Sequence, residues 1–297
     1  QVAKELNYQP NHLASALRKG KSNLVGVIVP RTNSSFFSSV VENMEEVLNK
    51  AGYNIIITQS NESFEKECKN IDALLYTQVD GIIASMANET VDLSYFEKIK
   101  SYGIPLILFD RGENDLNVDY VGIDDYKSSH MIVDHLVSQG CKRIAHIGGY
   151  RRTRIFNNRI RGYIDAIKKH DLPHDDELLI ESSLTLEDGR QQIEKLLALK
   201  NRPDAVYVAS DYAALGSLQV LKEKGIKVPE EIKLVGFGNE PFTSLVTPSI
   251  TSINQHSEQI GKLAAETFLG YLERDVVVQS LNKIILDSEL IVRSSSE

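Results

Sequence analysis

Residues Leu24–Val29 read LVGVIV, an unbroken apolar run that ends at Pro30. A strand that is apolar along its whole length has both faces covered, as in a parallel sheet between layers of helices. The next segment, Phe36–Ala51, repeats its apolar residues at helical spacing, and Gly52 is placed to end that helix. A buried strand followed by an amphipathic helix is therefore the unit from which we predict the fold.

The same unit recurs along the chain in two series. In the first we expect strands at 53–58, 81–85, 105–109 and 120–123 and helices at 63–77 and 93–101. The second begins with a helix at 125–139 and continues with strands at 143–147, 178–181, 205–209 and 233–237 and helices at 158–170, 186–199 and 211–224. This alternation predicts an α/β fold with two similar parallel-sheet lobes. We place the first lobe at 24–123 plus about 254–285 and the second at 124–253 plus about 286–297, after a leader at 1–23.

Ligands of open parallel sheets bind beyond the carboxyl ends of the strands. The loops expected at those ends are 30–37, 109–115, 148–158, 210–212 and 238–242. Gly148-Gly149 follows a strand, but no GxGxxG or GxxxxGK[ST] pattern surrounds it, so a nucleotide site is poorly supported. We predict no cofactor and no metal site.

Composition narrows the class of protein. The chain has 297 residues, of which 42% are hydrophobic, and no apolar run approaches the roughly 18 residues of a membrane span. The N-terminus lacks the apolar stretch of a signal peptide, so we do not expect secretion unless a signal has been removed. Cys68 and Cys141 form no CxxC pattern, and we expect reduced, packed thiols in the cytoplasm. No GxSxG pattern appears and the seven histidines are scattered, so we do not expect an enzyme.

The leader differs from the rest of the chain in charge and in length of its helices. Residues 1–23 carry a net charge of +3, so the remainder carries −11 of the total of −8. Pro10 ends one short helical piece, and Asn11 is suited to cap another that runs to about Lys19. About two turns are too short to be stable alone in water. A helix that folds against a phosphate backbone and a plain flexible leader fit these facts equally well.

The segment Tyr8–Pro30 closely resembles the lactose/galactose-repressor (LacI/GalR) family, where it spans the end of the DNA-binding headpiece, the hinge helix and the first core strand. Further strings typical of the family follow in order at 33–37, 79–83, 105–111, 121–125, 159–163, 210–216 and 248–255. The resemblance covers nearly the whole chain. It implies a core like the type I periplasmic binding proteins behind a remnant of a helix-turn-helix headpiece. The base-reading helix is then expected upstream of Gln1, and a chain without it should bind DNA poorly.

The resemblance also implies how the leader meets DNA. The hinge helix of this family enters the minor groove, and Leu17 matches the leucine that is wedged between base steps and kinks the duplex. Ser15 stands where the family has an arginine, which puts that phosphate contact in doubt. The implied hinge contacts are Asn11, Ala14, Leu17, Arg18 and Lys19.

A small effector, a sugar or a sugar derivative, is implied to bind between the lobes. Of Phe36 and Phe37, which match aromatic positions of the family, we expect one to face the sugar and the other the core. Arg159 matches the family's effector-binding arginine, and Asp211, which opens a helix, is either a ligand contact or only a helix cap. The predicted contacts are Ser35, Phe36, Phe37, Asp110, Arg111, Arg159, Asp211, Asn239 and Glu240.

Two features bear on the identity of the effector. Gly238 stands where the family has an aspartate that holds the effector, so either Asn239 or Glu240 takes over or the ligand lacks the matching hydroxyl. The loop Arg151-Arg152-Thr153-Arg154 is expected to be solvated, although its three positive charges would also suit an anionic effector such as a sugar acid.

These observations predict a cytoplasmic DNA-binding transcriptional regulator of the repressor type, whose affinity for its operator depends on the effector. The expected partners are operator DNA, the effector and a second copy of the chain in a dimer or tetramer, with no membrane. The alternative is a periplasmic or lipid-anchored sugar-binding protein, which has the same two-lobed fold.

Overall fold

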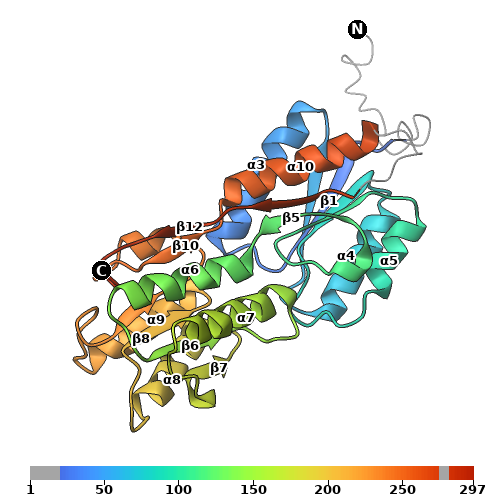
Figure 1. Ribbon diagram of the computed structural model, residues 1–297. Helices are drawn as coiled ribbons and strands as arrows, with labels where there is room; N and C mark the ends of the chain where they lie inside the picture. Colours follow the sequence, from blue (N-terminus) through green and yellow to red (C-terminus); the bar gives the residue numbers. More distant parts are fainter. Residues whose placement is uncertain (1–20, 274–280) are drawn as a thin grey trace, which may run out of the picture. The chain divides into compact units, whose positions relative to one another are not determined.

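The computed structural model describes residues 21–273 and 281–297 (Figure 1). The chain divides into two compact units, each with its own sheet. The first consists of the described parts of 1–33, 37–121 and 258–283, and the second of 34–36, 122–257 and 284–297. The boundaries predicted for the two lobes, after residues 123, 253 and 285, remain a prediction.

The first unit supplies β5-β4-β3-β1-β2 of a six-stranded sheet, in that order, and β11, which starts at the last residue of this unit, is the edge strand next to β5. The pairs of β1 with β2 and β3, of β3 with β4 and of β4 with β5 are all parallel. The strands are β1 (Leu24–Val29), β2 (Asn54–Gln59), β3 (Gly81–Ala84), β4 (Leu106–Phe109), β5 (Asp119–Ile123) and β11 (Lys283–Leu286).

Helices cover both faces of this sheet, which explains the continuous apolar strands. On one face, α4 (Phe64–Tyr76) and α5 (Ser94–Ser101) share a buried cluster with strand residues such as Ile28 and Ile82. On the other lie α3 (Ser35–Lys50) and α10 (Ser257–Glu273), since a Cβ at Gly81 would meet the Phe268 ring of α10 at 2.2 Å. The two helices α3 and α10 run side by side in Figure 1.

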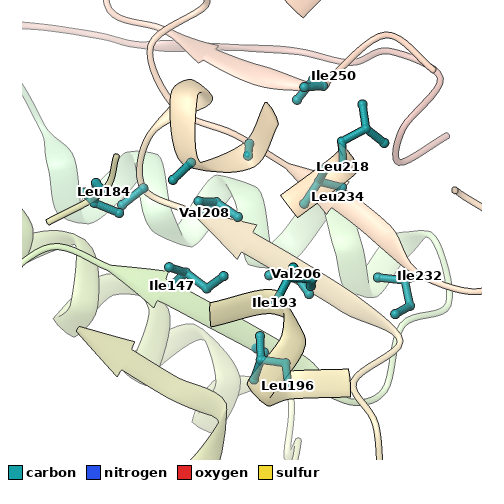
Figure 2. Packing of buried hydrophobic residues seen from close by; sticks show 14 of the residues in the cluster. Ile147, Leu184, Ile193, Leu196, Val206, Val208, Leu218, Ile232, Leu234 and Ile250 are labelled. Atoms are coloured by element: carbon teal, nitrogen blue, oxygen red, sulfur yellow. The ribbon is translucent and has the colours of Figure 1, made fainter. Parts of the chain in front are cut away.

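The second unit repeats the plan with four parallel strands in the order β7-β6-β8-β9. Alternate residues of β6 and β8 face opposite helix layers. His146 and Tyr207 face α6 and α7. Ile147, Val206 and Val208 belong to the apolar cluster shared with α8 and α9, part of which is shown in Figure 2. The strands are β6 (Ile144–Gly148), β7 (Leu179–Glu181), β8 (Ala205–Val208) and β9 (Lys233–Val235). The helices are α6 (Asp125–Ser138), α7 (Arg154–Lys169), α8 (Leu186–Leu197) and α9 (Asp211–Glu223).

The C-terminal segment returns to the second unit. There β10 (Ser252–Asn254) pairs antiparallel with β12 (Glu289–Ile291). The last residues also contact β9, because the Leu234 backbone N–H donates to the Ser295 carbonyl oxygen at 2.8 Å. Three short 3₁₀ helices complete the described structure: η1 (Asn114–Leu116), η2 (Asp176–Leu178) and η3 (Pro241–Ser244).

Most elements match the prediction to within one or two residues, so the predicted α/β fold is confirmed. Gly140 and Gly225, which follow α6 and α9, have φ of 85° and 71°, the left-handed conformation in which glycine ends helices. One boundary was wrong: α7 begins at Arg154, not at 158, because Thr153 is extended and its carbonyl accepts the Asn157 N–H at 3.0 Å. The prediction also assigned no elements to α10, β10, β11 and β12.

In the described parts of the chain, no helix is both long and apolar enough to cross a membrane.

Candidate functional site

The predicted contact residues lie near the carboxyl ends of strands in both units. In the first unit, Asp110 and Arg111 directly follow β4. In the second, Asp211 opens the helix after β8, and Asn239 and Glu240 follow β9. This is the edge at which open parallel sheets bind ligands.

Arg111 is held by carboxylates in the first unit. Its Nη1 donates to Glu62 Oε2 at 2.6 Å, and its Nε lies 3.7 Å from Asp110 Oδ2. The Arg111 and Glu62 side chains are only 11% and 15% exposed, so this pair is shielded from water. Glu62 was missed by sequence reasoning. It stands in the loop after β2, to which the strand-end rule applies as well.

Asp110 has a left-handed backbone, with φ of 55°. This conformation is uncommon for residues other than glycine, and aspartate and asparagine tolerate it best. The Tyr120 hydroxyl donates to the Asp110 carbonyl oxygen at 2.7 Å, and the Ser85 hydroxyl lies 3.4 Å from Asp110 Oδ2. These contacts fix the direction in which the carboxylate leaves the strand.

Phe36 and Phe37 are both buried, with 7% and 6% exposed. The Phe37 ring contacts the Phe109 ring edge-on with centroids 6.3 Å apart, and the Arg111 guanidinium lies 5.8 Å from the Phe37 centroid. Phe37 therefore packs next to Arg111, which directly follows Asp110. That one phenylalanine faces a sugar remains a prediction.

Arg159 is the most enclosed cation among the predicted contacts. Its Nε donates to Asp125 Oδ1 at 2.7 Å, and both side chains are at most 5% exposed. Its Nη1 donates to the Ala209 carbonyl oxygen at 3.2 Å, and Nη2 lies 3.5 Å from Gln255 Oε1. The guanidinium carbon stacks 3.6 Å from the centroid of the Phe237 ring. Asp125, Gln255 and Phe237 were not singled out as site residues from the sequence.

Asp211 organises the loop after β9. Its Oδ2 accepts the Glu240 backbone N–H at 2.8 Å and its Oδ1 accepts the Ser252 hydroxyl at 2.7 Å. Burial raises the pKa of Asp211 to about 6, although both hydrogen bonds favour the ionised form. The side chain thus holds a loop rather than capping its own helix, for which Ser210 is the N-cap residue.

The absence of an aspartate at position 238 has a local explanation. Gly238 has φ of 131°, and a Cβ there would lie 3.3 Å from Asp211 Oδ2. A second carboxylate at 238 would be strained and would stand next to a buried one.

Asn239 and Glu240 are held by partners distant in sequence. Arg293 Nη2 donates to Asn239 Oδ1 at 2.7 Å, and Asn239 has a left-handed backbone with φ of 53°. Glu240 Oε1 accepts the Ser34 hydroxyl at 3.1 Å, and Oε2 accepts the Ser35 hydroxyl and, at 3.3 Å, its backbone N–H. The structure therefore brings the predicted residues Ser35 and Glu240 together, and it adds Arg293.

Comparison with known proteins decides the family. A family model for a periplasmic-binding-protein-like domain matches residues 133–296. The HTH-type transcriptional regulator DegA of Bacillus subtilis (strain 168) is 31% identical over 296 residues, which cover 99% of this chain and 87% of DegA. The chain belongs to the LacI family of transcriptional regulators.

Solved structures agree with this LacI-family assignment. The crystal structure of the transcription regulator CcpA of Lactococcus lactis has a TM-score of 0.85 at 28% identity, covering 92% of this chain and 99% of that one. The transcriptional regulator CelR, solved as a complex with cellobiose, has a TM-score of 0.84 at 25% identity, covering 99% of this chain and 88% of that one. These relatives are named as transcription regulators and not as enzymes.

Arg151 and Arg152 of the arginine-rich loop of this LacI-family chain are exposed, as the prediction of a solvated loop requires. Arg154 belongs to the first turn of α7 and not to the loop. Arg151 donates from Nε to Glu181 Oε1 at 2.9 Å and from its backbone N–H to Oε2 at 3.0 Å. The Arg152 guanidinium lies 5.0 Å from the Tyr150 ring centroid. Of the three arginines, Arg151 thus has a carboxylate partner, at a side chain that is 47% exposed.

The hinge contacts expected for a LacI-family protein, Asn11, Ala14, Leu17, Arg18 and Lys19, lie outside the described residues.

Proposed function

We propose that this chain is the effector-responsive part of a cytoplasmic transcriptional repressor, whose affinity for operator DNA is set by a small polyhydroxylated molecule, a sugar or a sugar derivative. The observation that supports this most is the environment of Arg159. A buried guanidinium with one edge on Asp125 and one face on Phe237 is a rigid, oriented donor at the ligand-binding edge of a parallel sheet. The relationship to DegA over almost the whole chain supports the link from such a site to DNA.

The proposed contacts to the effector are Ser35, Phe36, Phe37, Asp110, Arg111, Arg159, Asp211, Asn239 and Glu240. Carboxylates accept hydrogen bonds from ligand hydroxyls, the arginines donate to ligand oxygens, and an aromatic face packs on the C–H side of a sugar ring. This mixture suits a polyhydroxylated ligand better than an apolar one.

The proposed mechanism is thermodynamic linkage. The effector binds two arrangements of the protein with different affinity and so shifts their populations, and operator affinity changes by the same coupling free energy. Two hinge segments in a homodimer make the DNA contacts, with Leu17 as the wedge and Asn11, Ala14, Arg18 and Lys19 around it. One short helix is too unstable to hold the minor groove alone, which is why the proposal includes a dimer.

Leu17→Ala in the full-length protein tests the DNA-binding half of this proposal. An operator is first selected from random duplexes by the wild-type protein, and its affinity is measured by fluorescence anisotropy. Loss of the wedge should weaken operator binding by about tenfold or more, because the kinked duplex loses the contact that offsets unstacking. Effector affinity, measured by calorimetry, should stay the same.

Leu17→Met is the matched control, since it keeps a long apolar side chain and should keep most of the affinity. A full-length protein that binds sugars but selects no duplex at low salt would instead be a sugar-binding protein. Equal loss of operator and effector affinity in Leu17→Ala would contradict the separate roles proposed for hinge and core.

A further inference from the structure

The Arg111 guanidinium in the first unit has its charge balanced before any ligand arrives. Glu62, in the loop after β2, accepts from Arg111 Nη1 at 2.6 Å, and Asp110 Oδ2 lies 3.7 Å from Arg111 Nε. Arg31 Nε lies 3.5 Å from the other oxygen of Glu62, so two arginines meet two carboxylates here. The group as a whole carries no excess positive charge.

Glu62 is fixed in place by its own backbone and by a neighbouring loop. Asn61 and Glu62 both have left-handed backbones, with φ of 53° and 65°. Glu62 Oε2 accepts the Asn88 backbone N–H at 3.0 Å, and the Glu62 carbonyl oxygen accepts the Glu89 N–H at 3.3 Å. Burial disfavours its ionised form, but Arg111 and the Asn88 N–H more than compensate and hold the pKa of the Glu62 carboxyl below its usual value. The carboxylate is therefore ionised at neutral pH and does not swing away freely.

An anionic ligand should bind more weakly than a neutral one beside Arg111. To pair with Arg111, a ligand carboxylate or phosphate must approach Glu62 and Asp110, and the like charges repel each other in a poorly hydrated place. If the anion displaced Glu62 from Arg111, the largely buried Glu62 carboxylate would lose its closer, buried partner and keep only the more exposed Arg31, 3.5 Å from its other oxygen. A hydroxyl has neither problem, because it donates to a carboxylate and accepts from the guanidinium with no change in net charge.

We infer that Glu62 is a specificity-determining residue, which selects uncharged polyhydroxylated effectors over sugar acids and sugar phosphates by keeping Arg111 charge-compensated. The inference rests on the proposed function, in which Arg111 contacts the effector. It favours a neutral effector over the anionic one that the arginine-rich loop would also suit, and one of the three arginines there, Arg151, already pairs with Glu181.

Calorimetry with matched ligand pairs tests the inference on the full chain. Each neutral sugar is compared with a charged counterpart. Glucose is paired with gluconate and, separately, with glucose 6-phosphate, ribose with ribose 5-phosphate, and cellobiose with cellobionate. The wild type should bind the neutral member of its best pair at least about tenfold more tightly. Glu62→Gln keeps the shape and a hydrogen bond to Arg111 but removes the charge, and it should shrink that ratio by about tenfold.

Glu65→Gln is the matched control. It removes the same charge three positions along the chain, in the first turn of α4, from a side chain that is 78% exposed and pairs with Lys69, and it should leave the ratio unchanged. Glu62→Asp keeps the charge and should keep the preference for neutral ligands. Thermal melts of all variants establish that the measured chains are folded, and the wild-type ratio tests the preference without any variant.

A wild type that prefers the acids or phosphates would overturn the inference, as would a Glu62→Gln ratio equal to that of the wild type. Either outcome leaves the proposed repressor function standing, because a ligand has still bound. Failure of every sugar to bind, together with failure to select an operator, would overturn both.

Discussion

At the scale of single residues, the buried ion pairs of this protein differ in energy from those on its surface. Arg159 and Asp125 are almost completely enclosed, whereas pairs such as Arg190 with Glu223 lie in solvent, with Glu223 58% exposed. Two charges in water attract each other weakly, but a buried charge whose partner is removed retains the full cost of its desolvation. Breaking the Arg159–Asp125 pair should therefore lower the free energy of unfolding much more than breaking the Arg190–Glu223 pair.

Asp125→Asn should lower the free energy of unfolding by about 3 kcal/mol, because it leaves the Arg159 guanidinium buried with no counter-charge. Glu223→Gln, which breaks a pair on the surface, should cost much less. Urea denaturation of both variants followed by circular dichroism makes the comparison. Equal costs would show that Arg159 reaches water or another anion when Asp125 is lost.

At the scale of elements, α8 with α9 and α6 with α7 are among the described helix pairs that approach so closely that only glycine fits at the contact. A Cβ at Gly189 of α8 would lie 1.9 Å from the Ala213 carbonyl oxygen of α9, and one at Gly216 of α9 would lie 2.0 Å from the Leu186 carbonyl oxygen of α8. At the α6–α7 contact, a Cβ at Gly162 would lie 2.3 Å from the Tyr126 carbonyl oxygen. These obstacles are backbone atoms, so a larger residue has to push whole helices apart.

Gly216→Ala should therefore cost about 2 kcal/mol or more in stability, in spite of the higher helix propensity of alanine. Gly270→Ala in α10 is the control, since no atom lies within 4 Å of the added Cβ, and it should be neutral or stabilise by less than about 1 kcal/mol. Thermal unfolding of the two variants distinguishes packing from propensity. A stabilised Gly216→Ala protein would mean that α8 and α9 separate at little cost.

At the scale of the whole molecule, one buried histidine links stability to pH. His146 lies under α6 and α7 with its ring stacked 4.1 Å from that of Tyr207, and its Nδ1 lies 3.1 Å from the Tyr207 carbonyl oxygen, to which it donates. Burial lowers the pKa of His146 from 6.5 to about 3. Between these two values the unfolded chain binds a proton that the folded chain does not, so stability falls as the pH falls from about 6.5 towards 3.

Lowering the pH from 7 to 5 should therefore remove about 2 kcal/mol of stability through His146. The raised pKa of Asp211 acts in the opposite sense over part of this range, so the comparison with a His146→Phe variant isolates the histidine. Urea denaturation at both pH values should show a loss that is about 2 kcal/mol larger in the wild type than in the variant. The same loss in both proteins would place the titrating group elsewhere.

The sequence alone determined the order and type of most elements, the α/β class and the family. Apolar runs such as Leu24–Val29 and glycines such as Gly140 and Gly225 act through local physics, burial of a strand and the left-handed end of a helix, and local physics is visible in a few consecutive residues. Even there, the start of α7 was misjudged: residues 154–157 are helical, although the prediction placed them in the loop that follows Gly148.

Only the tertiary structure decided which side chains meet. Glu62 with Arg111, Asp125 with Arg159, Arg293 with Asn239 and Glu240 with Ser35 are pairs between loops, strand ends and helix starts that are far apart in the chain. Periodicity specifies which face of an element is buried, but partners at a strand edge depend on how the sheet orders its strands and where each loop turns. The charge state of the candidate site, and hence the class of ligand it favours, follows from those partners and not from any stretch of sequence read alone.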